Sequence, residues 1–313
     1  MTGEIQLIAG SSYPSLAQRI GRRLKIKVTP TEIKRFADGE IYVRIKKKVR
    51  GNDVFVIQSL YPPANEHLME LLIIIDALKR ASARRINIIC PYLCYSRQDR
   101  KVASREPITA KLVANLITRA GADRLVTIDL HADQIQGYYD IPVDHFFGYS
   151  QFGEFLKKHF SLRSMVVVSP DIGGVKRAHK LADFLNVPLA VIDKVRKKHN
   201  HAQVEHIVGE VKGKRVVIID DIIDTGGSIA AAARALKKVG AAKVVVCASH
   251  AIFSEGASEK LRRAPLDKIL LLDTIPLPAE KKTPQMKILP LSPLWAKIIR
   301  RIHIEHSLGT LFV

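Results

Sequence analysis

Short apolar segments alternate with amphipathic segments along this chain, and this alternation is what most limits the folds open to it. The apolar segments have the length of strands and are rich in β-branched residues, whereas the others repeat apolar residues at helical spacing. The pattern predicts an α/β fold with parallel sheets covered by helices on both faces. The expected strands are residues 5–8, 54–57, 86–89, 125–128, 165–168, 189–192, 216–219, 244–246 and 269–272. The expected helices include residues 67–81, 109–120, 175–185 and 228–239.

The length of 313 residues allows one large domain or two smaller ones. The alternation runs through both halves, which indicates two similar α/β units with a boundary near residues 149–160. We therefore predict an N-terminal domain over residues 1–148 and a C-terminal domain over residues 149–313.

Polar side chains follow three of the expected strands at their carboxyl ends, where open α/β sheets bind ligands. Asp129 and His131 follow the strand at 125–128, and Asp171 with two glycines follows the strand at 165–168. A histidine at a strand end is often structural, but beside an acid it could also ligate a metal or a polyphosphate. Asp171 could hold a hydrated Mg²⁺ in the same way.

The strand at 216–219 ends in the most informative segment of the chain. Its residues are Asp220, Asp221, Asp224, Thr225, Gly226, Gly227 and Ser228. The glycine turn would offer backbone N–H groups and a positive helix end to a phosphate, while the carboxylates could accept sugar hydroxyls or hold Mg²⁺ through water. The alternative is an ordinary strand-to-helix turn with an aspartate cap, but three clustered acids repel one another unless a ligand or cation compensates them.

Three further loops have both a binding and a plain interpretation. Arg97 and Gln98 begin a loop with three cations that could grip an oxyanion or form a solvated charge run. Residues 35–40 could stack a base on Phe36 or form a simple turn. The basic segment 193–200 could close over a reacting polyphosphate, or be surface.

Composition excludes some classes of protein. No apolar run approaches the roughly 20 residues of a membrane span, and the N-terminus lacks the pattern of a signal peptide. The cysteines Cys90, Cys94 and Cys247 suit a reducing cytoplasm, and the spacing of the first two favours core packing over metal binding. A net charge of +20 suits either a nucleic-acid binder or a protein with several polyphosphate ligands, and it decides between neither.

Taken together, these segments resemble the ribose-phosphate pyrophosphokinases of the common bacterial type over nearly the whole chain. The phrase Asp-Leu-His-Ala with Gln-Ile-Gln-Gly at 129–137 is specific to that family, whereas Asp-Asp-x-x-Asp-Thr-Gly at 220–226 is shared with phosphoribosyltransferases. Other matching segments are residues 35–40, 65–72, 97–101, 105–111, 141–144 and 169–174.

The resemblance implies two phosphoribosyltransferase-like domains that place ATP and ribose 5-phosphate together. The implied ATP residues are Phe36, Asp38, Gly39 and Glu40, from a neighbouring subunit, with Arg97 and Gln98. The implied ribose 5-phosphate residues are Arg196, Asp220, Asp221, Asp224, Thr225, Gly226, Gly227 and Ser228. His131 and Asp171 would position Mg²⁺, and Lys194 with Arg196 would form the catalytic basic pair.

The implied reaction moves the diphosphoryl group of ATP to the C1 hydroxyl of ribose 5-phosphate. It releases AMP and supplies nucleotide, histidine and tryptophan biosynthesis. The resemblance also implies a cytoplasmic hexamer regulated by phosphate and ADP, with no nucleic-acid or membrane partner. Val195, Lys197 and Ser228 depart from the arginine, proline and threonine that are commoner in the family at those positions.

Three other functions are weaker explanations of these residues. A phosphoribosyltransferase would need the turn at 220–228 but would leave Arg97, His131 and Lys194 unexplained. A catalytically silent regulatory subunit would be expected to lose part of the active-site set, which is complete here. A nucleic-acid binder would depend on the charge alone.

Overall fold

The computed structural model describes residues 3–198 and 201–311, apart from the side chains of residues 194–205. The chain forms two compact units. The first joins the chain up to Phe147 with the segment from Leu291 onward, and the second spans Gly148–Pro290. The predicted boundary at 148 lies beside the first division, but the segment from Leu291 onward packs with the N-terminal unit rather than with the second domain.

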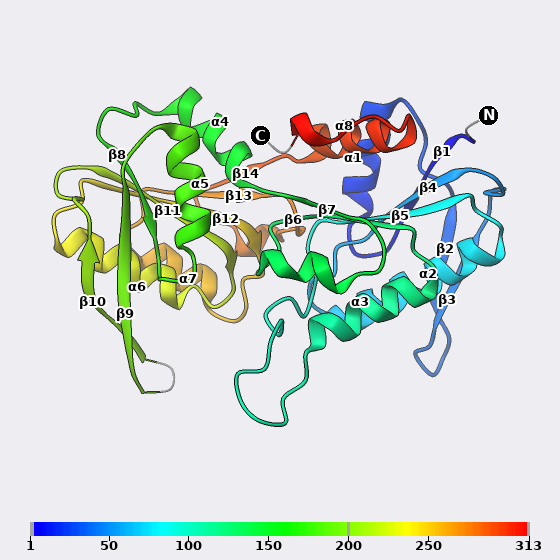
Figure 1. The fold of residues 1–313 in the computed structure, drawn as a ribbon, viewed down its shortest axis with the longest axis horizontal. Helices are drawn as coiled ribbons and strands as arrows, with labels where there is room; N and C mark the ends of the chain where they lie inside the picture. The colour runs from blue at the N-terminus through cyan, green and yellow to red at the C-terminus, as the bar shows by residue number, and fades with distance from the viewer. Residues whose placement is uncertain (1–2, 199–200, 312–313) are drawn as a thin grey trace. The chain divides into compact units, whose positions relative to one another are not determined.

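The first unit is built on a five-stranded parallel sheet. In spatial order its strands are β1 (Ile5–Ala9), β4 (Asp53–Ile57), β5 (Arg85–Cys90), β6 (Arg124–Ile128) and β7 (Val143–Phe146). Helices α1 (Pro14–Leu24) and α8 (Ser292–His303) lie over one face, and α2 (Ala64–Arg80) and α3 (Thr109–Ala120) over the other (Figure 1). A hairpin of β2 (Thr31–Arg35) and β3 (Ile41–Ile45) adjoins α2.

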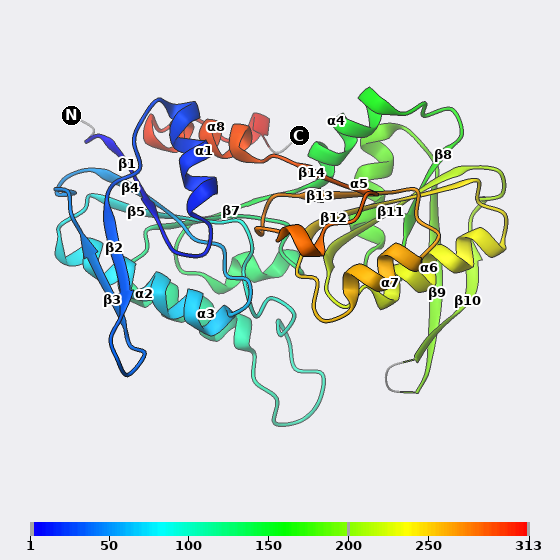
Figure 2. The ribbon, with the colours of Figure 1, turned by 180° about the vertical axis from the view of Figure 1, so that it is seen from behind.

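The second unit is built on a seven-stranded, mainly parallel sheet. In spatial order its strands are β10 (His201–Val208), β9 (Leu189–Lys198), β8 (Met165–Ser169), β11 (Arg215–Ile223), β12 (Lys243–Ala251), β13 (Lys268–Leu272) and β14 (Met286–Leu289). Helices α4 (Tyr149–His159) and α5 (Val175–Leu185) cover one face, and α6 (Gly227–Lys238) and α7 (Ala257–Arg263) cover the other (Figure 2). Short 3₁₀ segments at Asp133–Tyr138, Ala279–Lys281 and Gly309–Leu311 complete the two units.

The alternation read from the sequence is confirmed, because each expected strand and helix is present. Strands β4 and β8 are buried along their whole length, which explains why they are continuous apolar runs rather than alternating ones. Cys90 and Cys94 lie in the core of the first unit, as their spacing indicated, and Cys247 is buried in the second. Among the described residues, no helix has the length and apolar character that crossing a bilayer requires.

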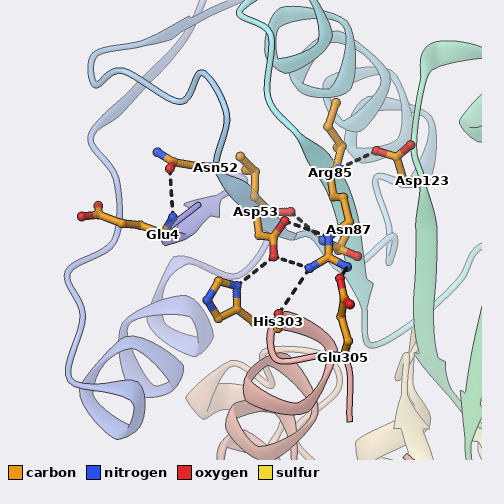
Figure 3. Close-up of polar contacts among 10 residues, drawn as sticks. Glu4, Asn52, Asp53, Arg85, Asn87, Asp123, His303 and Glu305 are labelled. Carbon is orange, nitrogen blue, oxygen red and sulfur yellow. Dashed lines mark hydrogen bonds and ion pairs between the residues drawn. The ribbon is translucent and has the colours of Figure 1, made fainter. Parts of the chain in front are cut away.

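A buried carboxylate joins the C-terminal segment to the rest of the first unit (Figure 3). Asp53, at the start of β4, is fully buried. It accepts two hydrogen bonds from the guanidinium of Arg85, the first from Nε at 2.8 Å, and it lies 2.8 Å from Nδ1 of His303 in α8. Arg85 also donates to Glu305 at 3.2 Å. Residues far apart in the sequence are therefore joined through one acid.

The partners of Asp53 decide its protonation. Burial alone would raise the pKa of this carboxyl, but hydrogen bonds from Arg85 and His303 and their charges lower it below the ordinary value of 3.8. The carboxylate therefore stays ionised inside the fold. The ionised carboxylate stabilises the folded chain through its contacts with Arg85 and His303.

We expect Asp53→Asn to lower the free energy of unfolding by about 2 kcal/mol, because it removes the buried one of the two carboxylates that pair with the partly buried Arg85. Urea unfolding of the purified protein would measure the loss. Asp76→Asn is the matched control, since Asp76 pairs with Arg80 at an exposed position of α2 and should contribute little. Equal losses in the two variants would contradict this role for Asp53.

The difference between wild type and Asp53→Asn should also depend on pH. Asp53 has a lower pKa folded than unfolded, so its contribution is complete above the unfolded value and is lost as pH falls through the folded value. The free energies of unfolding of the two proteins should therefore differ fully near pH 5, begin to converge only below about pH 4, and meet below the folded pKa of Asp53. A difference that grew on acidification would have the wrong sign for this explanation.

Candidate functional site

In the sheet of the second unit, the side on which successive strands are added changes between β8 and β11. From β8 the chain proceeds to β9 on one side, and β11 then pairs with β8 on the other side. Such a switch point leaves a crevice at the carboxyl ends of the two strands, where open α/β sheets bind ligands. The five-stranded sheet of the first unit adds its strands in one direction only.

Two of the predicted acids stand on a projecting end of β11. Pairing between β11 and β8 ends at Ile218 with Val168, whereas β11 continues beside β12 as far as Ile223. The sequence placed Asp220 and Asp221 after this strand, but in the structure they lie within it. One edge of the strand is unpaired with β8 at this level.

Arg177 of α5 compensates this pair of acids in part. Its Nη1 lies 3.3 Å from Oδ1 of the buried Asp221 and 3.6 Å from Oδ1 of Asp220. Burial, followed by the charge of Asp221, nevertheless raises the pKa of Asp220 well above its ordinary value; Arg177 opposes the shift and Asp171 adds to it. The carboxyl of Asp220 therefore takes up a proton more readily than a free aspartic acid does.

Asp171 belongs to this cluster through the turn that follows β8. Its Oδ1 accepts a hydrogen bond of 2.9 Å from the backbone N–H of Gly174, and its carbonyl oxygen accepts one of 2.6 Å from the hydroxyl of Ser169. The side chain is exposed, and its charge acts on Asp220. The structure therefore brings together Asp171, Asp220 and Asp221, as the rule of carboxyl ends predicted.

The glycine turn delivers the N-terminus of α6 to the same edge. Gly226 has φ of +73°, and a Cβ there would lie 3.2 Å from Cγ of Leu261. Only glycine fits this turn without strain. No described side chain caps the helix, so the first N–H groups of α6 can serve an anion. Asp224 accepts hydrogen bonds from the hydroxyl of Ser254, through its carboxylate, and from the Ser254 N–H, 3.1 Å from its carbonyl oxygen.

A second polar cluster lies at the carboxyl edge of the first unit. The loop with Arg97 and Gln98 follows β5, and the loop with His131 follows β6. Hydrogen bonds join the two loops. The carboxylate of Asp99 accepts one of 2.8 Å from Nε2 of Gln134, and its carbonyl oxygen accepts one of 2.5 Å from the hydroxyl of Tyr138. The structure thus brings the exposed Arg97 and Gln98 into the same part of the unit as His131.

His145 supports this second cluster, and sequence reasoning missed it. It is buried on β7, where its Nε2 accepts a hydrogen bond of 2.9 Å from the N–H of Leu130, and its Nδ1 lies 3.9 Å from Asp133. Arg177 was missed as well. His145 follows the segment 141–144 and Arg177 comes three residues after the segment 169–174, but only their neighbours in the fold give them a role.

The aromatic segment forms the tip of the β2–β3 hairpin. Gly39 has φ of +95°, and Asp38 accepts a hydrogen bond of 3.0 Å from the N–H of Glu40, so the expected turn is present. Phe36 is 53% exposed, with its ring edge-on to Tyr42. Arg35 joins the hairpin to Glu66 of α2 at 2.6 Å.

Lys194 and Arg196, the catalytic pair that the resemblance implies, lie on β9. Residues 194–198 continue β9, which pairs antiparallel with β10, where the sequence indicated a flexible basic loop. The side chains of Lys194 and Arg196 lie outside the described part of the chain. Over the described residues, no three His, Cys, Asp or Glu side chains lie close enough to hold a metal ion by themselves.

Comparison with known proteins assigns both halves of the chain. Residues 5–121 match the model of the N-terminal domain of ribose phosphate pyrophosphokinase, and residues 203–313 match that of the phosphoribosyl synthetase-associated domain. The chain is 51% identical to the ribose-phosphate pyrophosphokinase of Caldanaerobacter subterraneus over 99% of its own length and 98% of the relative's. It is 50% identical to that of Bacillus caldolyticus over the same shares. The crystal structure of phosphoribosylpyrophosphate synthetase from Mycobacterium smegmatis superposes with a TM-score of 0.91 at 44% identity, covering 96% of this chain and 99% of that one.

We expect Gly226→Ala to destabilise the protein by about 1–2 kcal/mol, because a non-glycine residue is strained in the left-handed region. Gly227→Ala is the control, since its Cβ would meet nothing nearer than the Thr225 hydroxyl at 3.7 Å. Urea unfolding of both variants would measure the difference. Similar losses would show that the conformation of the turn does not depend on Gly226.

Proposed function

Because the chain belongs to the ribose-phosphate pyrophosphokinase family, we propose that its two polar edges divide the two substrates of that activity. The enzyme is a ribose-phosphate diphosphokinase that forms 5-phosphoribosyl 1-diphosphate from ATP and ribose 5-phosphate. We assign ribose 5-phosphate to the second unit and ATP to the first.

The observation that supports the first assignment is the acid pair beside an uncapped helix end. The carboxylate oxygens of Asp220 and Asp221 can accept hydrogen bonds from the ribose hydroxyls. The N–H groups from Thr225 to Ser228 can hold the 5-phosphate. Asp224 keeps the turn in place through Ser254. The sugar hydroxyls thereby meet carboxylates, and the phosphate meets the positive end of α6.

The second assignment depends on the joined loops of the first unit. Arg97 and Gln98 are exposed there and can donate to the phosphates of ATP, and His131 stands on the adjoining loop. Phe36, Asp38, Gly39 and Glu40 occupy an exposed hairpin tip. That tip is suited to receive the adenine ring of ATP bound mainly by a neighbouring subunit, by stacking on Phe36 and by hydrogen bonds to the acids.

The reaction requires the C1 oxygen of the ribose to attack the β-phosphorus of ATP. The bond between the β-phosphorus and the oxygen bridging it to the α-phosphorus breaks, and AMP leaves with that electron pair. Charge increases on the diphosphoryl group and on AMP, so cations beside them accelerate the step. We assign this role to Lys194 and Arg196, with Arg196 also near the ribose phosphate.

The carboxylates at the switch point also suit a magnesium ion. Mg²⁺ prefers oxygen ligands and commonly uses one or two carboxylates together with substrate phosphates and water. Asp171 is exposed, and its charge acts on the neighbouring Asp220. When bound, Mg²⁺ would neutralise charge on the diphosphoryl group. We assign Asp171 to position magnesium at this edge, and His131 to position magnesium in the first unit.

Several properties follow from family membership alone and stay proposals. These are a hexameric assembly, activation by phosphate, inhibition by ADP, a cytoplasmic location, and supply of histidine and tryptophan biosynthesis. The hairpin tip gives the first of them a physical reason. An exposed Phe36 flanked by acids is better explained by a neighbouring subunit's substrate than by solvent.

The decisive experiment incubates the purified protein with ATP, Mg²⁺, ribose 5-phosphate and inorganic phosphate. We expect AMP and 5-phosphoribosyl 1-diphosphate in equal amounts. Formation of ADP instead would mean transfer of the γ-phosphoryl group alone and would contradict the proposal. A parallel reaction with 5-phosphoribosyl 1-diphosphate and a free nucleobase tests for a phosphoribosyltransferase.

A pair of substitutions tests the division of the substrates. Asp220→Asn should raise the KM for ribose 5-phosphate about tenfold while the KM for ATP changes little, because it removes one acceptor of sugar hydroxyls. Arg97→Gln should do the reverse. Steady-state kinetics with each substrate varied would measure both. If both variants affected the same substrate, the division would be wrong.

A further inference from the structure

A positively charged hollow lies between α1 and α8, outside the two polar edges. Figures 1 and 2 show these helices side by side on one face of the first sheet. The hollow has a volume of about 210 Å³. Its lining residues are Arg23, Leu24, Pro293, Ala296, Lys297 and Arg300.

The two helices that form the hollow contain no acidic residue. Within the described part of the chain, no carboxylate pairs with Arg23, Lys297 or Arg300, and all three side chains are exposed. Nε of Arg23 donates to the hydroxyl of Ser292 at 3.3 Å, which holds its guanidinium at the start of α8.

Three like charges around one hollow repel one another, and an anion between them would remove that repulsion. Two are guanidinium groups, which bind phosphate oxygens in a fixed two-pronged geometry. The volume far exceeds the roughly 10–15 Å³ needed for one water molecule, and Leu24, Pro293 and Ala296 give the hollow an apolar wall.

We propose that this hollow binds a compact polyphosphate anion, such as inorganic triphosphate or the polyphosphate end of a small metabolite. The limited volume favours a compact ligand over a nucleic-acid strand. A second copy of the chain would bring the same positive surface to it and is disfavoured for that reason. The site is separate from the assigned substrate residues, because none of those lines the hollow.

Binding here would have a structural effect. The Arg23–Ser292 contact joins residues 269 positions apart in the sequence, so an anion held by α1 and α8 together also holds the C-terminal segment to the first unit. A ligand that binds only the folded form stabilises it in proportion to its occupancy.

The single tryptophan of the chain provides a local signal. Trp295 is fully buried in α8, next to Ala296 of the hollow. Titration of the whole protein with inorganic triphosphate, without Mg²⁺, should change the Trp295 fluorescence in a saturable way and raise the Tm. Calorimetry under the same conditions would give the affinity.

Paired variants test the site. Arg23→Gln with Arg300→Gln should weaken the fluorescence-detected binding about a hundredfold, at about tenfold for each lost arginine. Arg234→Gln with Lys238→Gln removes the same charge from the exposed side of α6 and should leave binding within about twofold. AMP formation by each variant confirms that it is folded.

Three results would overturn the proposal. The first is no change in Trp295 fluorescence or Tm with triphosphate. The second is equal weakening in the two double variants, which would indicate a response to net charge alone. The third is tight binding of a single-stranded oligoribonucleotide that depends on Arg23 and Arg300 and that triphosphate does not displace, because that would mark a surface for a nucleic-acid polymer.

Discussion

Parallel pairing of buried strands is the constraint on which the rest of this structure depends. Parallel neighbours must be joined by crossovers, so each sheet acquires helices on both faces, and the loops that follow its parallel strands open at one edge. Asp171 follows β8 and Asp220 lies within β11, and the pairing of β8 with β11 places them together. The same rule joins the Arg97 and His131 loops of the first unit.

The electrostatics of the switch point support the proposal that this edge binds a sugar phosphate. Burial and the neighbouring acids raise the pKa of Asp220, and Arg177 opposes this shift only in part. Beside it, the N-terminus of α6 supplies positive character without a side-chain cap. Hydroxyls, a divalent cation and a phosphate would each find a matching group within this one edge.

The course of the C-terminal segment shows the limit of local sequence reasoning. The alternating pattern continues to the end of the chain, and so the second domain was expected to include residues 291–313. In the structure α8 leaves that domain and packs beside α1, where His303 reaches the buried Asp53. No local pattern in either segment indicates the other, because the interaction joins residues 250 positions apart.

The sequence by itself determined the strands, the helices, the sheet type and the motifs at 129–137 and 220–228, because apolar periodicity and turn chemistry act over a few residues. Recognition of those motifs also indicated the family that the comparisons confirmed. Only the tertiary structure decided that Asp220 and Asp221 project from the end of β11, that Arg177 and His145 support the two polar edges, and that α8 belongs with α1. These features depend on register and packing between distant segments, where burial and charge are determined by neighbours that local sequence does not contain.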